Sequence, residues 1–252
     1  MEKDHIGKEF MKKTTYKYTS KSDQSLGVTQ PPLELEYAHK MRSIELPKPS
    51  ELNIGNLNLR NAIEERKSVR NYSEKPITLS ELSWLLWCTQ GVKEIRQQVA
   101  TLRTVPSAGA RHALETFILA NNVDNLEKGI YRYVALEHKL VEYIIEDDIA
   151  DKIVEAAYDQ KMVKNNAVTF IWVAVPYRMC WRYVERGYRY LHIDAGHVCQ
   201  NLYLAAENID AGVCAIAAFH DDIFNKTLYL DGEEEFVIYI ASVGKKKKIN
   251  NH

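Results

Sequence analysis

The segment Arg66-Lys67-Ser68-Val69-Arg70 places cations two and four residues apart around a hydroxyl group. We expect a short helix to end here and an extended segment to follow, so that Arg66, Ser68 and Arg70 can point the same way. Side chains of this kind make charge-assisted contacts to a phosphate or a polyol chain. The alternative is a solvated basic helix end, which on local grounds alone is the commoner use of such residues.

A second cluster is the stretch of small residues T-V-P-S-A-G-A-R-H over residues 104–112. Small side chains allow a flat ligand to approach the backbone, while Ser107 and the main-chain N–H groups supply hydrogen-bond donors. The alternative is a surface turn before a strand.

The third cluster is a run of lysines, Lys245 to Lys248, directly after Gly244. A lysine run near a terminus is usually a solvated tail. Its position at the end of an expected core strand makes one or two of these lysines candidates for a second phosphate clamp.

Residues 177–190 combine four arginines with five aromatic residues. Such a composition could stack on planar ligands or on single-stranded bases. The near-zero net charge argues against nucleic acid. We expect a mobile segment at a substrate pocket or a subunit interface, with Tyr188, Arg189 and Tyr190 as pocket candidates; plain interface packing is the alternative.

The glycines exclude several motifs, because no two of the 11 are closer than nine positions. Glycine-rich phosphate loops and the nucleophile elbow all need glycines within a few residues of one another. The histidines and cysteines form no metal-ligand spacing, since His192 and His197 lie about 140° apart on a helix and no C-x-x-C pair occurs. We expect no metal site.

The composition indicates one globular, cytoplasmic protein. The chain has 252 residues, 33 Lys+Arg against 34 Asp+Glu, and 46% hydrophobic residues, which suffice for a core. The N-terminus has no apolar signal segment, and no apolar run is long enough to span a membrane. We therefore expect neither a membrane nor a nucleic acid as partner.

The elements that must position these clusters follow from hydrophobic periodicity. Residues 1–56 are polar and proline-containing and indicate an extended arm, and residues 57–252 form the folded domain. Thr78 and Glu81 predict a capping box, with Gly91 as the stop. We expect helices at 58–68, 78–91, 147–160, 190–207 and 221–228, strands at 115–121, 167–175 and 234–244, a hairpin at 129–144, and an apolar segment at 212–219. This interleaving predicts an α+β fold with three layers around one mixed sheet.

Taken in order, E-x-R-x-S-x-R at 64–70, P-S-A-G-A at 106–110, A-I-A-A-F at 215–219 and S-V-G-K at 242–245 resemble the flavin-dependent nitroreductase family. The longer stretches P-S-A-G-A-R-H-A-L-E-T-F, G-I-Y-R-Y, E-H-K-L and Y-R-Y-L-H-I-D-A-G-H-V-C-Q-N-L-Y-L-A-A-E look like its subgroup of SagB-type dehydrogenases, the azoline oxidases of peptide natural-product pathways. The likeness covers about residues 58–248.

The resemblance implies a mainly antiparallel mixed sheet flanked by helices, in an intertwined homodimer that binds FMN at the subunit interface. It places Ala215, Ile216, Ala217 and Ala218 beside the isoalloxazine, with the N–H of Ala217 near flavin N5. The other positions that it assigns to the cofactor are Arg66, Lys67, Ser68, Arg70, Gln160, Lys245 and Lys247, together with Pro106, Ser107, Ala108 and Gly109 from the other subunit. Ala110 stands where many members have Asn, and Ala217 where some have Glu, so the pyrimidine edge of the flavin must find other partners.

The implied activity is hydride transfer through flavin N5 in two half-reactions, with NAD(P)H as donor and a nitroaromatic compound or quinone as acceptor. One alternative is the oxidation of azolines with oxygen by a SagB-type dehydrogenase, and another is a flavin-destroying activity. From a different class, the chain could be a flavin-binding or partner-binding protein without turnover. The catalytic side chains are not identified by the sequence.

Overall fold

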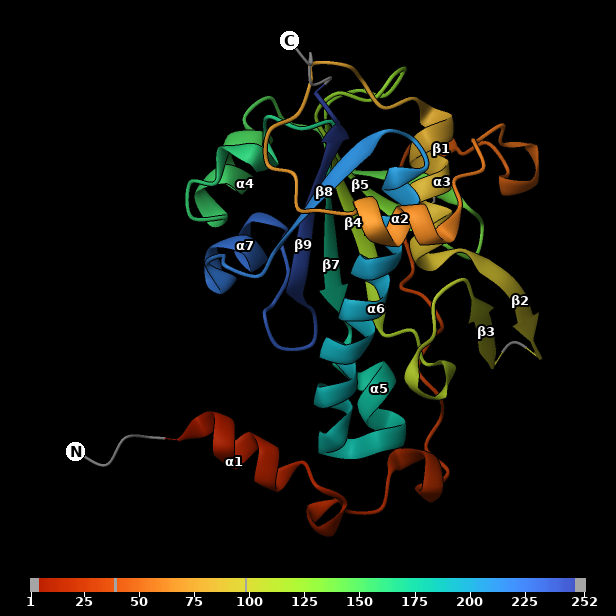
Figure 1. Cartoon of the computed structure of the whole chain (residues 1–252). Helices are drawn as coiled ribbons and strands as arrows, with labels where there is room; N and C mark the ends of the chain where they lie inside the picture. Colours follow the sequence, from red (N-terminus) through yellow and green to blue (C-terminus); the bar gives the residue numbers. More distant parts are fainter. Residues whose placement is uncertain (1–4, 39, 98, 248–252) are drawn as a thin grey trace.

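Seven strands form one sheet at the centre of the protein (Figure 1). The computed structural model describes residues 5–38, 40–97 and 99–247. The strands run in the order β1-β6-β5-β4-β7-β9-β8, and each neighbouring pair is antiparallel. An isolated parallel bridge between Ser68 and Val213 gives the β8 edge its mixed character. The strands are β1 Ser43–Glu45, β4 Leu114–Ala120, β5 Gly129–Val134, β6 Lys139–Ile144, β7 Val168–Ala174, β8 Ala211–Ile216 and β9 Phe236–Lys245.

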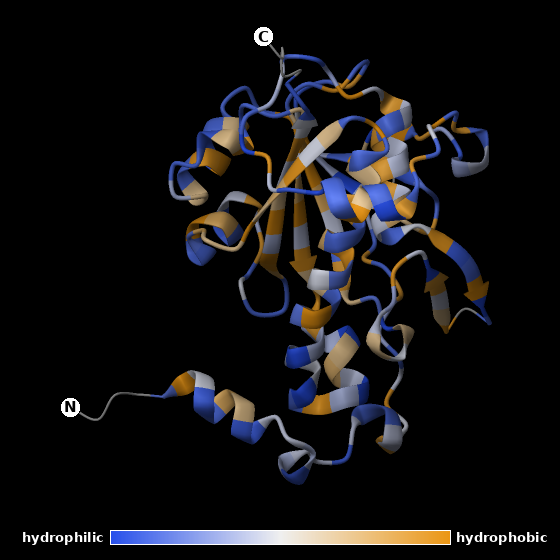
Figure 2. Cartoon of the chain, viewed as in Figure 1, coloured by the Kyte–Doolittle hydropathy of each residue, from blue (hydrophilic) through white to orange (hydrophobic). Residues whose placement is uncertain are grey.

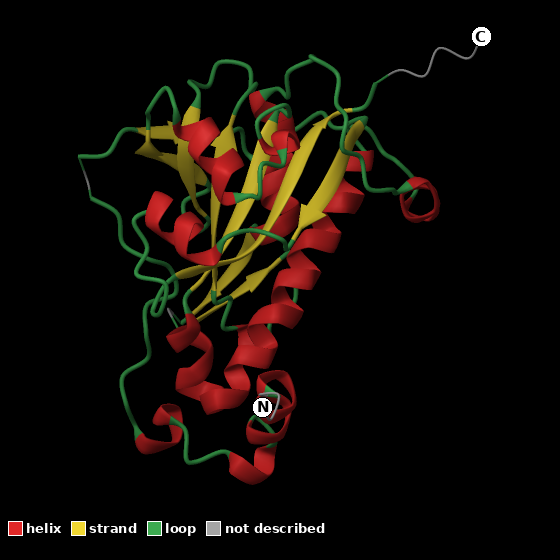
Figure 3. Cartoon of the chain, turned by 90° about the vertical axis from the view of Figure 1, so that its left-hand side faces the viewer, coloured by secondary structure: helices red, strands yellow, loops and turns green. Residues whose placement is uncertain are grey.

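Helices cover both faces of this sheet, because the central strands are apolar on both sides (Figures 2 and 3). On β7, Phe170 and Trp172 belong to one buried cluster and Ile171 and Val173 to the other. Helices α3 (Leu79–Gln90) and α6 (Gly187–Glu207) pack on the first cluster, and α4 (Ile149–Ala156) and α7 (Asp221–Thr227) pack on the second. The predicted three-layer α+β fold is thus confirmed.

Local sequence signals fix the ends of helices α2 and α3. Helix α2 spans Leu59–Glu65, and the side chain of its N-cap residue Asn58 accepts a hydrogen bond from the Arg60 N–H at 2.8 Å. The predicted capping box of α3 is present, with reciprocal bonds between Thr78 and Glu81. Gly91 ends α3, but its φ of −57° is not left-handed. A Cβ on Gly91 would lie 2.2 Å from the Trp87 ring, so glycine is needed there for space.

The first 56 residues are only partly the extended arm that the sequence predicts. Helix α1 (Ile6–Lys13) projects from the body (Figure 1), and β1 pairs with β6 at the edge of the main sheet. Both were missed, because eight residues of a polar helix and three residues of an edge strand leave little periodicity in the sequence. Short 3₁₀ helices occur both in this arm and in the folded domain, at Tyr16–Tyr18, Asp23–Leu26, Pro49–Glu51, Ala108–Ala110, Lys161–Val163 and Val184–Arg186.

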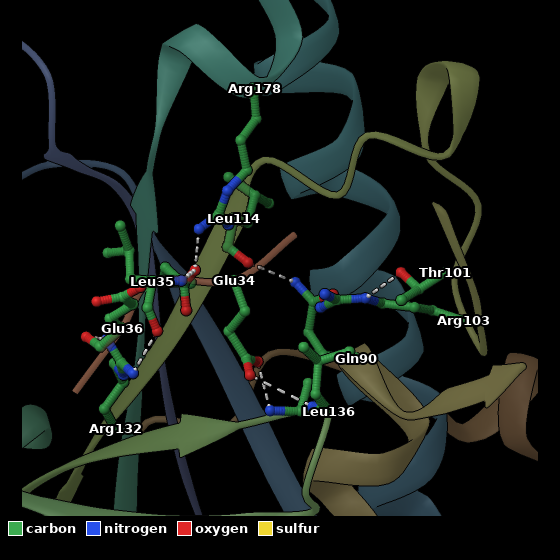
Figure 4. A network of polar contacts seen from close by, with 12 residues as sticks. Glu34, Leu35, Glu36, Gln90, Thr101, Arg103, Leu114, Arg132, Leu136 and Arg178 are labelled. Atoms are coloured by element: carbon green, nitrogen blue, oxygen red, sulfur yellow. Dashed lines mark hydrogen bonds and ion pairs between the residues drawn. The ribbon is translucent and has the colours of Figure 1, made fainter. Parts of the chain in front are cut away.

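Residues 34–36 cross the body of their own chain and are anchored by buried charges (Figure 4). The Glu34 carboxylate accepts from the Ala135 N–H at 2.6 Å, and Arg132 donates to the Leu35 carbonyl at 2.8 Å. The Leu35 N–H donates to Glu115, whose carboxylate also pairs with Arg178 at 2.5 Å. This part of the arm therefore wraps its own chain.

Residues 177–190 lie in a pair of helices rather than in an irregular segment. Helix α5 (Pro176–Tyr183) begins at the proline that follows β7, and α6 starts at Gly187, three residues before the predicted Tyr190. Between them Val184 has a φ of 52°, which is strained for a β-branched residue. A further hairpin, β2 (Val92–Arg96) with β3 (Ala100–Arg103), was not predicted.

Candidate functional site

The basic segment that follows α2 lies along the outer strand of the sheet. The Val69 N–H donates to the Val213 carbonyl on β8 at 2.9 Å, and Ser68 forms the parallel bridge to the same residue. Arg66 is half-buried, whereas Lys67, Ser68 and Arg70 are exposed. The backbone bonding to β8 therefore fixes the segment, while its cationic side chains and hydroxyl stay available to a ligand.

Tyr203 of α6 joins this segment to β8. Its hydroxyl lies 3.0 Å from Ser68 Oγ and accepts from the Ala215 N–H at 2.9 Å, and the Arg66 guanidinium lies 5.3 Å from the centre of its ring. Arg66 and Ser68 of the basic segment and Ala215 of β8, which are predicted as cofactor residues from two distant parts of the sequence, are thereby brought together. The sequence analysis missed Tyr203, although it lies in the stretch N-L-Y-L-A-A-E that carried the resemblance.

The loop after β8 presents small residues to the solvent. Ile216 is buried, but Ala217 and Ala218 are exposed, and neither of their N–H groups takes part in a loop or turn hydrogen bond among the described residues. Gln160 donates from Nε2 to the Ala218 carbonyl at 2.9 Å and to the Ala157 carbonyl at 2.8 Å. Gln160 thus holds the loop in place.

The lysines at the end of β9 differ in availability. Lys245 Nζ lies 2.5 Å from Glu81 Oε1 and 2.6 Å from the Ile209 carbonyl, so its predicted role as a phosphate clamp competes with a structural one. Lys246 pairs with the buried Glu207. Lys247 is exposed, and with Ser73 it lines a pocket of about 470 Å³. Lys248 lies outside the described residues.

The small-residue loop of residues 104–112 packs against α5 and α6. Ser107 Oγ accepts from the His112 N–H at 2.9 Å. Gly109 has a φ of +58°, and a Cβ there would lie 2.5 Å from the Tyr183 hydroxyl, so both conformation and space require glycine. The Arg111 guanidinium stacks on Trp181, 5.4 Å from its ring centre. Pro106 and Gly109 are exposed, while Ser107, Ala108 and Ala110 are half-buried.

The loop and the basic segment meet α6 at different levels. Burial raises the pKa of Asp194, against the opposing hydrogen bonds from Ser107 and Ala108, which places the loop beside this carboxyl. Tyr203, beside the basic segment, is nine residues further along the helix, or about 14 Å at 1.5 Å per residue. One chain therefore does not bring Ser107 and Ser68 together on α6.

The three pocket candidates in the α5–α6 pair contact other parts of the same chain. Arg189 Nε donates to Thr14 Oγ1 at 2.5 Å, and the Tyr190 hydroxyl lies 3.1 Å from that of Tyr16. Tyr188 is half-buried against the main core, and burial raises its pKa. Arg189 and Tyr190 thus hold the N-terminal arm in this structure, and their assignment to a substrate pocket stays a prediction.

The described residues contain no group of three or more His, Cys, Asp and Glu that could hold a metal ion. Within the same residues, no helix is both long and apolar enough to cross a membrane.

Two relatives of known sequence resemble most of this chain. The protein MJ1384 of Methanocaldococcus jannaschii, named as a nitroreductase, is 32% identical over 203 residues, which are 81% of this chain and 96% of that protein. The trifolitoxin operon protein TfxC of Rhizobium leguminosarum bv. trifolii is 25% identical over 84% of this chain, and the match spans 62% of TfxC.

Solved structures share the fold. A protein of Ralstonia eutropha named as a nitroreductase has a TM-score of 0.68 at 22% identity, over 87% of this chain and 95% of that one. A chain of the Escherichia coli microcin synthetase McbBCD complex, with truncated pro-MccB17 bound, has a TM-score of 0.62 at 18% identity, over 96% and 92%. The NADPH:FMN oxidoreductase of Vibrio harveyi, complexed with NAD⁺, has a TM-score of 0.54 at 14% identity, over 76% and 70%.

The model of the nitroreductase family matches residues 63–245, from the end of α2 to the end of β9. This range contains the basic segment, the small-residue loop and the loop after β8. The chain belongs to the nitroreductase family.

Proposed function

We propose that this protein is an FMN-dependent oxidoreductase that uses NAD(P)H to reduce a small acceptor, such as a nitroaromatic compound or a quinone. When bound, FMN would supply the group that accepts a hydride and passes it on. The observation that carries the proposal is the junction at Tyr203, which joins a cationic segment to an exposed loop of small residues.

The donors at this junction fit a phosphorylated, flat ligand. Because Tyr203 accepts from the Ala215 N–H, its own proton is free to go to Ser68 Oγ. The Ser68 proton is then left for an anionic oxygen, beside the guanidinium groups of Arg66 and Arg70. We assign these three side chains to the phosphate and ribityl side of FMN, with Lys67 and Lys247 adding positive charge.

The loop after β8 would receive the ring system. Ala217 and Ala218 offer a flat ligand an approach to the backbone, and the Ala217 N–H is available as a donor. The hydrogen bond from Gln160 to the Ala218 carbonyl orients this loop before any ligand arrives. We assign a positioning role to Gln160 on this basis.

A second copy of the chain would complete the site. Ser107 and Ala108 bond to Asp194, which lies about 14 Å along α6 from Tyr203, so a partner subunit is the source from which Pro106, Ser107 and Ala108 could reach the ligand. We therefore propose a homodimer in which each FMN contacts both chains.

The reductase activity is tested by mixing the FMN-loaded protein with NADH or NADPH without oxygen. We expect bleaching of the flavin absorption, followed by its return when a nitroaromatic compound or a quinone is added. Bleaching by dithionite alone would remove the assignment of NAD(P)H as donor. Failure of dithionite as well would favour a flavin-binding protein without turnover.

A second candidate is the oxidation of an azoline to an azole with oxygen as electron acceptor. It is favoured by the fold likeness to a chain of the McbBCD complex, which extends over 96% of this chain and so includes most of its N-terminal arm. Azole formation removes two electrons and two protons, which reduce one O₂ to hydrogen peroxide. Peroxide release that depends on an added thiazoline peptide, without NAD(P)H, would select this candidate over the first.

A further inference from the structure

A pocket of about 380 Å³ lies between α2, α3 and α6, and residues 55–57 form its rim. Trp84, Trp87 and Cys88 line it from one face of α3, at the i, i+3 and i+4 spacing of a helix. From α6 the corresponding wall is formed by Asn201, Leu204, Ala205 and Asn208. The volume lies within the range of pockets that hold small organic molecules.

The walls of this pocket are mainly apolar, and they carry no charge. Among the described residues that line it, none is Lys, Arg, Asp, Glu or His. Trp84 and Trp87 are only half-buried, so part of each large indole surface faces the opening. Covering aromatic surface of this kind is favourable, and a flat aromatic partner gains additional stacking energy.

Two of the three side-chain amides in the lining, those of Asn201 and Asn208 on α6, give the pocket directional polarity. Asn201 donates from Nδ2 to the Cys88 carbonyl at 2.9 Å and to the Thr104 carbonyl at 3.4 Å, which leaves its oxygen as an acceptor. Asn208 accepts from the Leu57 N–H at 2.7 Å through its oxygen, which leaves its NH₂ group as a donor. The Trp84 Nε1–H and the Thr104 hydroxyl are already bonded to carbonyls.

From these contacts we infer that the pocket is a second ligand site, separate from the proposed FMN site, for an uncharged planar aromatic molecule that carries both a hydrogen-bond donor and an acceptor, such as an aromatic carboxamide or lactam. A carboxylate has no cation to pair with in the lining, and its desolvation would go uncompensated. A purely apolar ring would leave the two amide groups unpaired.

The site is connected to the small-residue loop through Thr104. This residue lines the pocket, its N–H donates to the Gly91 carbonyl at 2.9 Å, and its hydroxyl donates to the Trp87 carbonyl at 2.7 Å. A ligand held by Trp87 and Asn201 therefore contacts the residues that fix the start of the loop. The inference does not depend on the proposed flavin chemistry, because all its contacts lie within the pocket.

Cys88 reports on the pocket, and Cys180 is an internal control. Both thiols are half-buried, and burial raises the pKa of each to about 12, so both react slowly with N-ethylmaleimide. Only Cys88 lies in the pocket lining. Peptide mass spectrometry on the full-length protein measures the labelling rate of each cysteine separately.

The probes are benzamide and benzoate, which share a shape and differ in charge. At a benzamide concentration of ten times the Kd found by tryptophan fluorescence, we expect labelling of Cys88 to slow about tenfold while Cys180 is unchanged. Benzoate at the same concentration should protect neither cysteine. Equal protection by benzoate, or none by benzamide, would overturn the inference, as would a Cys88 that is unreactive in the free protein while Cys180 reacts.

A pair of variants on α6 locates the site independently. Leu204→Trp replaces an aliphatic side chain with a bulky indole ring in the pocket. Cys88 should then be protected without ligand, and benzamide should add no further protection. Ile193→Trp, on the same helix and 52% exposed, is the matched control and should leave protection by benzamide intact. Benzamide protection that persists unchanged in Leu204→Trp would show that the probe binds elsewhere.

Discussion

The hydroxyl of Tyr203 stands between two backbone segments that the sequence separates by well over 100 residues. It accepts from the Ala215 N–H and contacts Ser68 Oγ, and the ring lies under the Arg66 guanidinium. One phenol thus contacts the Ser68 hydroxyl, the Ala215 N–H and the Arg66 guanidinium. At the scale of single residues, the candidate site is pre-arranged by hydrogen bonding within the chain.

Replacing Tyr203 with Phe removes these hydrogen bonds and keeps the ring. The Ala215 N–H then loses its partner, so we expect a loss of about 1–2 kcal/mol in the free energy of unfolding. Urea denaturation measures this change, with Tyr158→Phe as the control, since Tyr158 is 53% exposed. Equal stability of the two variants would show that the Tyr203 hydroxyl contributes nothing.

Removing the cations tests the phosphate assignment. Arg66→Ala and Arg70→Ala should each weaken FMN binding about 10- to 150-fold, because a hydrogen bond to a charged group contributes about 1.5–3 kcal/mol. Flavin fluorescence titration measures the Kd. Arg60→Ala, on the preceding helix α2 and with a side chain 82% exposed, should bind FMN as the wild type does. Unchanged affinity in both test variants would refute the assignment.

At the scale of elements, backbone conformation and side-chain packing hold loop 104–112 in place. The left-handed Gly109 and the stacking of Arg111 on Trp181 fix the loop against α5, while the N-terminal arm approaches the same place: Trp181 Nε1 donates to the Val28 carbonyl at 2.9 Å. Arm, loop and helix therefore support one another.

Two Gly→Ala substitutions distinguish the conformational constraint at Gly109 from the general effect of adding a methyl group. Gly109→Ala should lower the free energy of unfolding by about 1–3 kcal/mol, because the residue must keep a positive φ and its methyl group would meet Tyr183. Gly196→Ala, in the middle of α6 with open space around its Cβ position, should raise it by about 0.5–1 kcal/mol. Thermal or urea unfolding measures both, and changes of the same sign would contradict the account of the loop.

The anchoring of the arm predicts a pH dependence. Burial, together with the neighbouring Glu115, raises the pKa of Glu34 to about 7, against the opposing charge of Arg103. Because the folded pKa exceeds the unfolded value of about 4.5, the folded state binds more protons between these values. The contribution of Glu34 to stability is therefore full below pH 4.5 and is lost as the pH rises through 7.

Glu34→Gln removes this titration while keeping an oxygen for the Ala135 N–H. Between pH 4.5 and 7.5, the free energy of unfolding of the wild type should fall by about 1–3 kcal/mol relative to that of the variant. Urea denaturation across this range gives the difference, and Glu36→Gln, an exposed neighbour in the arm, is the control. If the free energies of unfolding of the wild type and Glu34→Gln differ by the same amount at every pH, Glu34 does not titrate in this range.

The sequence predicted the elements whose signals are local. The capping box of α3 needs only Thr78 and Glu81, and β7 is a continuous apolar run before Pro176. It missed β1, which forms because β6 offers an unpaired edge, and the pairing of Lys245 with Glu81, which joins residues 164 positions apart. Tyr203 was not predicted as a site residue for the same reason, because only the folded chain brings it to Ser68.

At the scale of the whole molecule, the family fold explains why the candidate site is open in a single chain. The basic segment and the loop after β8 lie together, whereas Ser107 and Ala108 contact α6 at Asp194, nine residues from Tyr203, so we expect a second copy to complete the site. The balanced net charge of −1 agrees with a local concentration of cations around Arg66 rather than a general affinity for anions.

The proposed homodimer predicts the mass of the protein in solution. Light scattering or analytical ultracentrifugation of the full-length protein should give twice the 29.1 kDa mass of the chain. A monomer that nevertheless binds FMN tightly would show that residues 106–109 are not supplied by a partner.

The central claim is that the cluster around Arg66, Ser68 and Tyr203 binds FMN. Its most direct test is to incubate the purified protein with FMN, remove free ligand by gel filtration and record the visible spectrum. We predict a yellow protein that retains about one FMN per chain, and Arg66→Ala protein that elutes folded but colourless. A wild-type protein that stays colourless after this treatment would contradict the account.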